Sequence, residues 1–118
     1  MAKTKKQRAA PNSQYPLTEV LQKIDSGEFL IRQNAEDSGL ADFGWNRPRI
    51  IEAIKLLKER HFCMSITCNT NAWWFYDVYK ARLFGENVYI HLYIDDTDAM
   101  LIINSFKEDR DRTIRRRF

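Results

Sequence analysis

The hydrophobic residues of this 118-residue chain change their spacing once, near Phe62. Before that point apolar residues recur every three or four positions, which is the spacing of helices with one buried face. After it they alternate with polar residues, which is the spacing of strands with one buried face. The segments between the later strands are too short for a crossover helix, so these strands should pair as an antiparallel meander. The pattern therefore predicts an α+β fold, with N-terminal helices packed on one face of a curled antiparallel β-sheet.

Local signals set the expected bounds of these elements. Pro48 suits the first turn of a helix, because the N–H that proline lacks is not needed there. Helices are expected at Leu17–Ser26, from Asn34–Asp37 to Gly39 or Gly44, and at Arg47–Arg60, with a short extended segment at Phe29–Ile31. Strands are expected at Phe62–Cys68, Trp73–Leu83, Val88–Asp95 and Ala99–Lys107, with turns at Gly85–Asn87 and Asp95–Asp98.

Charge divides the chain into three parts. Residues 1–10 carry +4 and residues 108–118 carry +2, while the whole chain carries +3, which leaves −3 for the body between them. We expect a basic flexible arm at 1–16, a single α+β domain at 17–107 and a charged C-terminal tail at 108–118, since so short a chain supports one core. The basic ends either attract nucleic acid non-specifically or are simply solvated, and charge alone does not decide between these interpretations.

The sequence argues against several classes of protein. No apolar run approaches the roughly 20 residues that span a bilayer, so no membrane partner is expected. No apolar segment follows the basic N-terminus, so it is not a secretory signal, and a cytoplasmic location is expected. Cys63 and Cys68 have opposite parity and would point to opposite faces of one strand, which argues against a disulfide. With only two histidines elsewhere, neither a metal site nor a cofactor is expected.

The segment Val88–Asp95 carries the most functional information. Its aliphatic side chains share one parity and suit packing against the helices, whereas Tyr89, His91 and Tyr93 share the other. Aromatic rings stack on unpaired bases, phenols hydrogen-bond phosphate, and an imidazole transfers protons near neutral pH. This face therefore suits RNA. The alternative is an ordinary half-exposed strand face on which aromatic residues favour β structure.

Lys107 is expected close to Tyr89. Antiparallel pairing about the turn Asp95–Asp98 places opposite each other residues whose numbers sum to about 194–196, so Tyr89 should lie near Ser105–Lys107. A cation and a phenol would then meet at one sheet edge. The alternative is a solvated lysine at a strand end.

The preceding strand contains the dense aromatic cluster Trp73–Tyr76. Some of these rings must lie in the core, because aromatic burial supplies much of a small domain's stability. Tyr76, Lys80 and Arg82 share one parity and are expected on the open face.

Five blocks of the chain together resemble the MqsR family of toxins. They are Phe62–Thr67, Trp74–Tyr79, Arg82–Leu83, Val88–Ile90 and Ser105–Glu108. The resemblance covers about Leu17–Glu108 and implies a RelE-like α+β fold and endonucleolytic cleavage of messenger RNA. It also implies growth arrest by the unopposed toxin, neutralisation by a cognate antitoxin protein, and contact with operator DNA only through the antitoxin complex.

The resemblance also assigns individual residues. The family's catalytic tyrosine falls on Tyr89 and its C-terminal catalytic lysine on Lys107. The chain departs from the family at Tyr76, where a glutamine is expected, and at Met64, where a lysine is expected. Three explanations of Met64 stay open: His91, Lys80 or Arg82 replaces the lysine, the substrate preference differs, or activity is lower.

The predicted reaction is metal-independent attack by the RNA's own 2′-OH, which leaves a 2′,3′-cyclic phosphate and a 5′-OH end. Lys107 would stabilise charge on the phosphate, and Tyr89 would orient it or donate a proton. His91 is the acid–base candidate by its chemistry, not by the resemblance. Tyr76 would stack or orient, and Lys80, Arg82 and Tyr93 would bind RNA. Two alternatives stay open: a non-catalytic module that binds nucleic acid or an antitoxin, and a structural protein whose aromatic surface binds a protein partner.

Overall fold

The computed structural model describes residues 9–10, 12–68 and 71–110. Residues 1–8 of the predicted arm, residues 111–118 of the predicted tail, and the side chains of Cys68, Trp73 and Trp74 lie outside the described residues, so the domain boundaries stay a prediction. The helices are α1 (Leu17–Ser26), α2 (Gln33–Phe43), α3 (Arg47–Ile54) and the 3₁₀ helix η2 (Glu59–His61). The strands are β1 (Ala9–Ala10), β2 (Phe29–Ile31), β3 (Phe62–Cys68), β4 (Asn71–Leu83), β5 (Glu86–Ile94) and β6 (Leu101–Glu108). None of the helices in the described part is long and apolar enough to cross a membrane.

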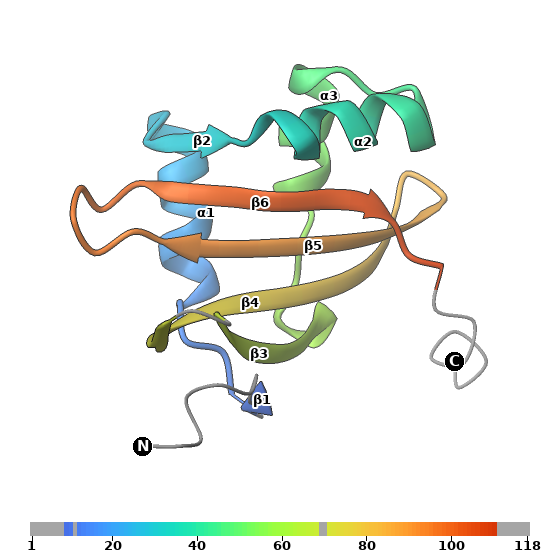
Figure 1. Ribbon diagram of the computed structural model, residues 1–118. Coiled ribbons are helices and arrows are strands. Elements are labelled where there is room, and N and C mark those ends of the chain that lie inside the picture. The colour runs from blue at the N-terminus through green and yellow to red at the C-terminus, as the bar shows by residue number, and fades with distance from the viewer. Residues whose placement is uncertain (1–8, 11, 69–70, 111–118) are drawn as a thin grey trace.

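The strands of the described residues form one sheet in the order β1-β3-β4-β5-β6-β2. Strands β3 to β6 form the predicted antiparallel meander, and the helices cover one face, so the α+β class is confirmed (Figure 1). The sheet is mixed, however, because β2 pairs parallel with β6. The extended segment Phe29–Ile31 was expected, but its place as a parallel edge strand of the sheet was not. The short segment between α1 and α2 runs alongside β6 and occupies hydrogen-bonding groups that an edge strand would otherwise expose.

The first two helices follow the prediction, and the third is shorter than expected. Helix α2 continues to Phe43 and ends at Gly44, whose φ of +73° favours glycine. Helix α3 ends at Ile54, not at the predicted Arg60. The N–H of Leu57 donates to the carbonyl of Ile54, three residues back, and the backbone is extended at Lys58. Leu57 is buried, although it reaches the core from the turn that follows α3. Its apolar side chain therefore matched the helical spacing without being part of the helix.

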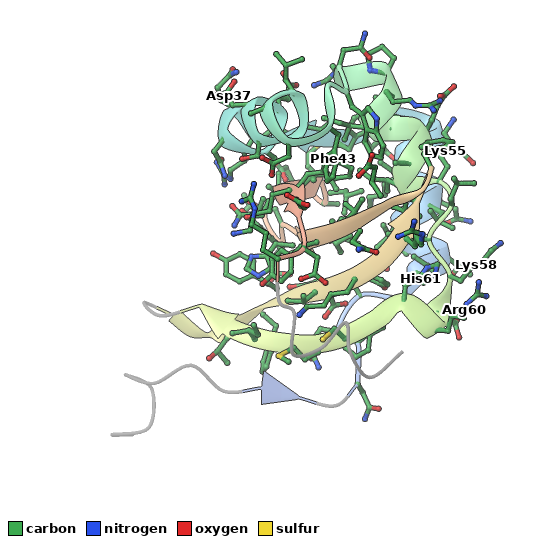
Figure 2. The ribbon with its side chains drawn as sticks, turned by 90° about the vertical axis from the view of Figure 1, so that its right-hand side faces the viewer. Asp37, Phe43, Lys55, Lys58, Arg60 and His61 are labelled. Carbon is green, nitrogen blue, oxygen red and sulfur yellow. The ribbon has the colours of Figure 1, made fainter. Side chains whose placement is uncertain are left out.

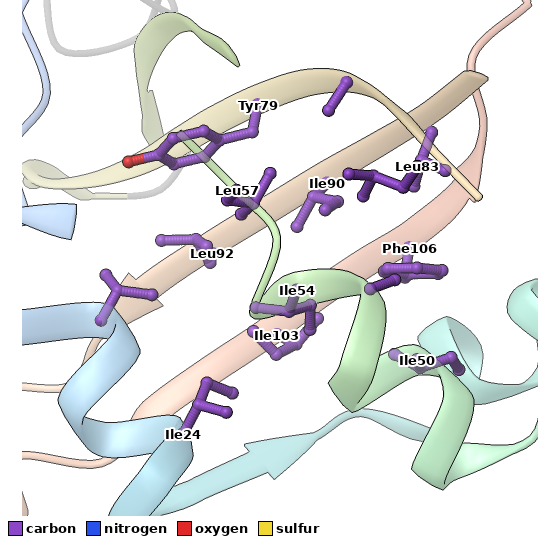
Figure 3. Close-up of a cluster of buried hydrophobic side chains, with 14 of the residues drawn as sticks. Ile24, Ile50, Ile54, Leu57, Tyr79, Leu83, Ile90, Leu92, Ile103 and Phe106 are labelled. Carbon is purple, nitrogen blue, oxygen red and sulfur yellow. The ribbon is translucent and has the colours of Figure 1, made fainter. Parts of the chain in front are cut away.

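The core lies between the helices and the adjacent face of the sheet (Figure 3). Val88, Ile90 and Leu92 of β5 are fully buried there. Gly39 explains how closely α2 approaches α3. A Cβ atom at this position would lie 2.7 Å from Cδ1 of Ile50, which is too close for any larger residue without a shift.

Segment 12–16, which precedes α1, is attached to β4 through one buried carboxylate. The backbone N–H groups of Gln14 and Tyr15 donate to Asp77 at 3.0–3.1 Å, and the Ser65 hydroxyl donates to the same carboxylate. Burial raises the pKa of Asp77, and these three donors oppose the shift. This part of the predicted arm is therefore held against the sheet.

Candidate active site

The open face of the sheet carries the predicted site on β4, β5 and β6, turned away from α1 and α3 (Figure 1). Tyr89 lies directly opposite Lys107, and their numbers sum to 196, so the predicted pairing is confirmed. On its other side Tyr89 lies opposite Lys80 of β4. The three side chains therefore come from three adjacent strands and share one face.

Two ammonium groups flank the Tyr89 ring. Nζ of Lys107 lies 5.3 Å from the ring centroid and Nζ of Lys80 lies 5.6 Å from it. Both distances are within the range of cation–π attraction. Lys107 is exposed, whereas Lys80 is partly buried and its Nζ lies 3.9 Å from a carboxylate oxygen of Asp109. The arrangement places positive charge on both sides of one phenol.

Tyr89 is joined to His91 by a hydrogen bond of 2.8 Å between the hydroxyl oxygen and Nε2. Burial, together with the nearby charge of Lys107, lowers the pKa of His91 to about 4, so the imidazole is neutral at pH 7. Burial, with Cys63 and Asp109 nearby, raises the pKa of Tyr89, so the phenol keeps its proton. Nδ1 of His91 is buried and has no hydrogen-bond partner among the described residues. The pair therefore holds one transferable proton between two neutral groups.

An aromatic stack continues from His91 along the open face. The Tyr76 and His91 rings stack at 5.1 Å with an angle of 8° between their planes, and Tyr93 meets Tyr76 edge-on at 5.5 Å. The Tyr93 hydroxyl accepts a hydrogen bond of 2.9 Å from Nη2 of Arg32. Tyr93 is only 2% exposed, so its ring has little surface open to RNA, which differs from the RNA-binding role expected for this residue.

Arg82 and Met64 lie at the margins of this site. Arg82 is exposed, and its Nη1 donates to Oδ1 of Asn87 at 3.2 Å. Met64 is half-buried and lies opposite Val78 on the neighbouring strand. It adds no charge to the open face.

A family model described as "Motility quorum-sensing regulator, toxin of MqsA" matches residues 12–108. The chain belongs to this toxin family. The match spans every strand of the meander and all the helices. A search of curated proteins finds no match.

Met64 and Tyr76, the two positions at which the resemblance leads one to expect a lysine and a glutamine, both lie on the open face. Of the candidates to replace the missing lysine, Lys80 is the one whose ammonium group contacts Tyr89 on the side away from Lys107. The described residues contain no group of three or more His, Cys, Asp or Glu side chains that could hold a metal ion.

Several partners of the site were not expected from the sequence. Arg32 is 61 residues from Tyr93, and no local pattern connects them. Asp109 was assigned to the charged tail, yet it is buried beside Lys80. Cys63 falls at an irregularity in the β3–β4 register and acts on the pKa of Tyr89. The register of the β4–β5 hairpin would have identified Lys80 as a neighbour of Tyr89, but only if the turn between these two strands had been placed correctly.

Proposed function

We propose that this toxin is an endoribonuclease that cleaves messenger RNA through the RNA's own 2′-OH. The observation that carries the proposal is the position of Tyr89, which lies between two ammonium groups and is hydrogen-bonded to a neutral imidazole. A scissile phosphodiester seated over Tyr89 would meet both cations and the proton-bearing pair together. Family membership supports a toxic activity of this kind.

Lys107 and Lys80 stabilise the charge that develops on the phosphate. Fixed donors directed at a developing oxyanion contribute about 3–4 kcal/mol each in well-studied enzymes. Lys107 is exposed and is the group that substrate reaches first. Lys80 is held in place by Asp109 and takes the role of the lysine that Met64 replaces.

Tyr89 and His91 act as a proton relay. As the 2′-oxygen attacks phosphorus, its proton passes to the Tyr89 oxygen while the Tyr89 proton moves to Nε2 of His91. When the P–O5′ bond breaks, a proton returns by the same path to the 5′-oxygen. The products are a 2′,3′-cyclic phosphate and a 5′-OH end. Positioned acid–base groups contribute roughly 10²–10⁴-fold to such reactions.

The aromatic stack and Arg82 bind the flanking RNA. Tyr76 is half-buried, and its ring stacks on or orients a base beside His91. Exposed Arg82 contacts phosphate, while Tyr93 and Arg32 hold the stack in position.

The family description names MqsA as the partner of the toxin, which supports a cognate antitoxin protein for this chain. We expect that antitoxin to neutralise the nuclease in the cytoplasm, where messenger RNA is available. Operator DNA would be bound only through the toxin–antitoxin complex.

The test is to incubate purified protein with a long messenger RNA and to map the ends of the fragments. Discrete cuts with 5′-OH and 2′,3′-cyclic phosphate ends support the proposal. Binding without cuts favours the non-catalytic module, for which the uncharged Met64 is the supporting observation. Cuts with 5′-phosphate ends would contradict attack by the 2′-OH.

A further inference from the structure

A pocket of about 590 Å³ opens beside the candidate active site, at the edge of β4. The register of β3 with β4 begins at the pair Phe62–Tyr79, so the β4 segment Lys80–Leu83 extends past the start of β3. Arg60 and His61 precede β3 and line the pocket at this end of the sheet, where Figure 2 labels them close to Lys58. The pocket is thus formed where one strand extends past its neighbour.

Positive charge dominates the lining of this pocket. Arg60, Lys80 and Arg82 contribute three cations, and Asp109 contributes one carboxylate. Asn87 accepts a hydrogen bond from Arg82, which holds that guanidinium at the pocket wall. Guanidinium groups are well suited to phosphate, because their donors match two of its oxygens at once. The excess of positive charge favours an anionic ligand.

His61 adds a neutral donor to the pocket. Its Nδ1 accepts a hydrogen bond of 2.9 Å from the backbone N–H of Lys58, which leaves the ring proton on Nε2. Burial lowers the pKa of His61, and the charges of Arg60 and Lys58 add to the effect, so the ring is neutral at pH 7. An Nε2–H group of this kind can hydrogen-bond a phosphate oxygen without adding charge.

Lys80 belongs to both the pocket and the candidate active site. We propose that the pocket binds the phosphodiester group next to the one that is cleaved. A single RNA strand then runs along β5, from the Tyr76–His91 stack across Tyr89 to the pocket beside Asn87. This inference rests on the proposed function, because it assigns a binding site to the part of the RNA substrate next to the cleaved bond.

The test measures binding of a short, single-stranded, all-2′-deoxy oligonucleotide, which lacks the attacking 2′-OH and is not cleaved. The double variant Arg60→Gln/Arg82→Gln removes two charges from the pocket. The matched control Arg47→Gln/Lys55→Gln removes two charges from α3 and the residue after it, where both side chains form exposed ion pairs. Circular dichroism verifies that both double variants are folded.

The pocket variant should bind about tenfold more weakly than wild type, and the control less than about threefold. The slope of log Kd against log salt concentration should fall by about 0.7 for the pocket variant, which corresponds to one single-strand phosphate. Equal losses for the two variants, or no oligonucleotide binding by the wild-type protein, would overturn the inference.

Cleavage of the matching RNA by wild-type protein is measured in parallel and separates the two proposals. If the wild-type protein cleaves RNA but both double variants lose binding equally, the proposed nuclease activity is supported and the proposed pocket is rejected. If the pocket variant alone loses binding but the wild-type protein does not cleave RNA, the phosphodiester-binding pocket is supported and the proposed nuclease activity is rejected.

Discussion

The two faces of β5 and β6 show how differently one pair of strands is used. On the core face Val88, Ile90 and Phe106 are completely buried among other apolar side chains. On the open face Tyr89 and Lys107 lie opposite each other and make contacts that depend on charge and direction. The core face is stabilised by the apolar surface that it buries and by the volume that its side chains fill, and many apolar sequences would supply both. The open face depends on particular groups at particular register positions, so the two faces should respond differently to substitution.

The largest effect is expected in the core. Phe106→Ala should lower the free energy of unfolding by about 3–5 kcal/mol, because it removes a buried ring that packs against Phe43 and Trp45. Phe84→Ala is the control, since Phe84 is 41% exposed, and it should cost about 1 kcal/mol. Urea unfolding measures both values. Equal losses would show that the core face is not assigned correctly.

The second effect concerns the two lysines beside Tyr89. Lys80→Met should reduce the rate of RNA cleavage about 10–100-fold, equivalent to about 1.4–3 kcal/mol, because the phosphate loses one cation. Adding Met64→Lys returns a cation to the open face and should restore part of the rate. If Lys80→Met cleaves at the wild-type rate while remaining folded, Lys80 does not replace the missing lysine.

The third effect is a dependence on pH that His91 introduces. Its folded pKa of about 4 lies below the unfolded value of about 6.5, so the unfolded state binds the proton more readily. The stabilising contribution of neutral His91 should therefore be fully present above pH 6.5. The free energy of unfolding should fall as the pH decreases toward 4. The ring is half-buried, so solvent screening limits this loss to about 1–2 kcal/mol.

His91→Gln should abolish that part of the stability profile. The cleavage rate of the wild type should also decline as His91 is protonated, and this apparent pKa should vanish in the variant. An identical rate profile for the two proteins would remove His91 from proton transfer.

The smallest effect is expected for Tyr76→Gln, which introduces the residue that the family resemblance leads one to expect. Loss of the ring stacked on His91 should cost about 0.5–1.5 kcal/mol of stability. It should also raise the pKa of His91 toward its ordinary value, because water reaches the ring more easily. An NMR titration of the histidine would detect the change, and an unaltered pKa would show that Tyr76 does not shield His91.

The core face of β5 was predictable from its alternation, which correctly identifies Val88, Ile90 and Leu92 as buried. In β6 the alternation breaks at the register shift, which brings Phe106 to the same face as Ile103.

The pairing of Tyr89 with Lys107 was predictable to within one residue from the turn at Asp95–Asp98, and the register shift between His91 and Leu92 selects Lys107 over Phe106. The pairing of Tyr89 with Lys80 was not predictable. A turn centred on Gly85–Asn87 would place Tyr89 opposite Leu83. The observed turn uses Phe84 and Gly85, with φ of +51° and +79°, and shifts the register by three residues.

Other features of the site have no signal in the sequence. The buried state of Asp109 depends on where the chain turns after β6, and the contact of Arg32 with Tyr93 depends on the placement of β2 beside β6. The strongly lowered pKa of His91 comes from burial and from Lys107, neither of which a residue's identity reveals. Composition therefore suggested the chemical groups of the site but not their protonation states.

The proposed active site depends most directly on Lys107, which is adjacent to the buried Phe106 and yet contributes to the opposite face. The decisive measurement is the rate at which purified Lys107→Ala cleaves messenger RNA, compared with wild type and with Lys55→Ala as a control on the helical side. Lys107→Ala should cleave at least about tenfold more slowly, a change of about 1.4 kcal/mol, with an unchanged free energy of unfolding. A folded Lys107→Ala protein that cleaves as fast as wild type would contradict the proposed active site.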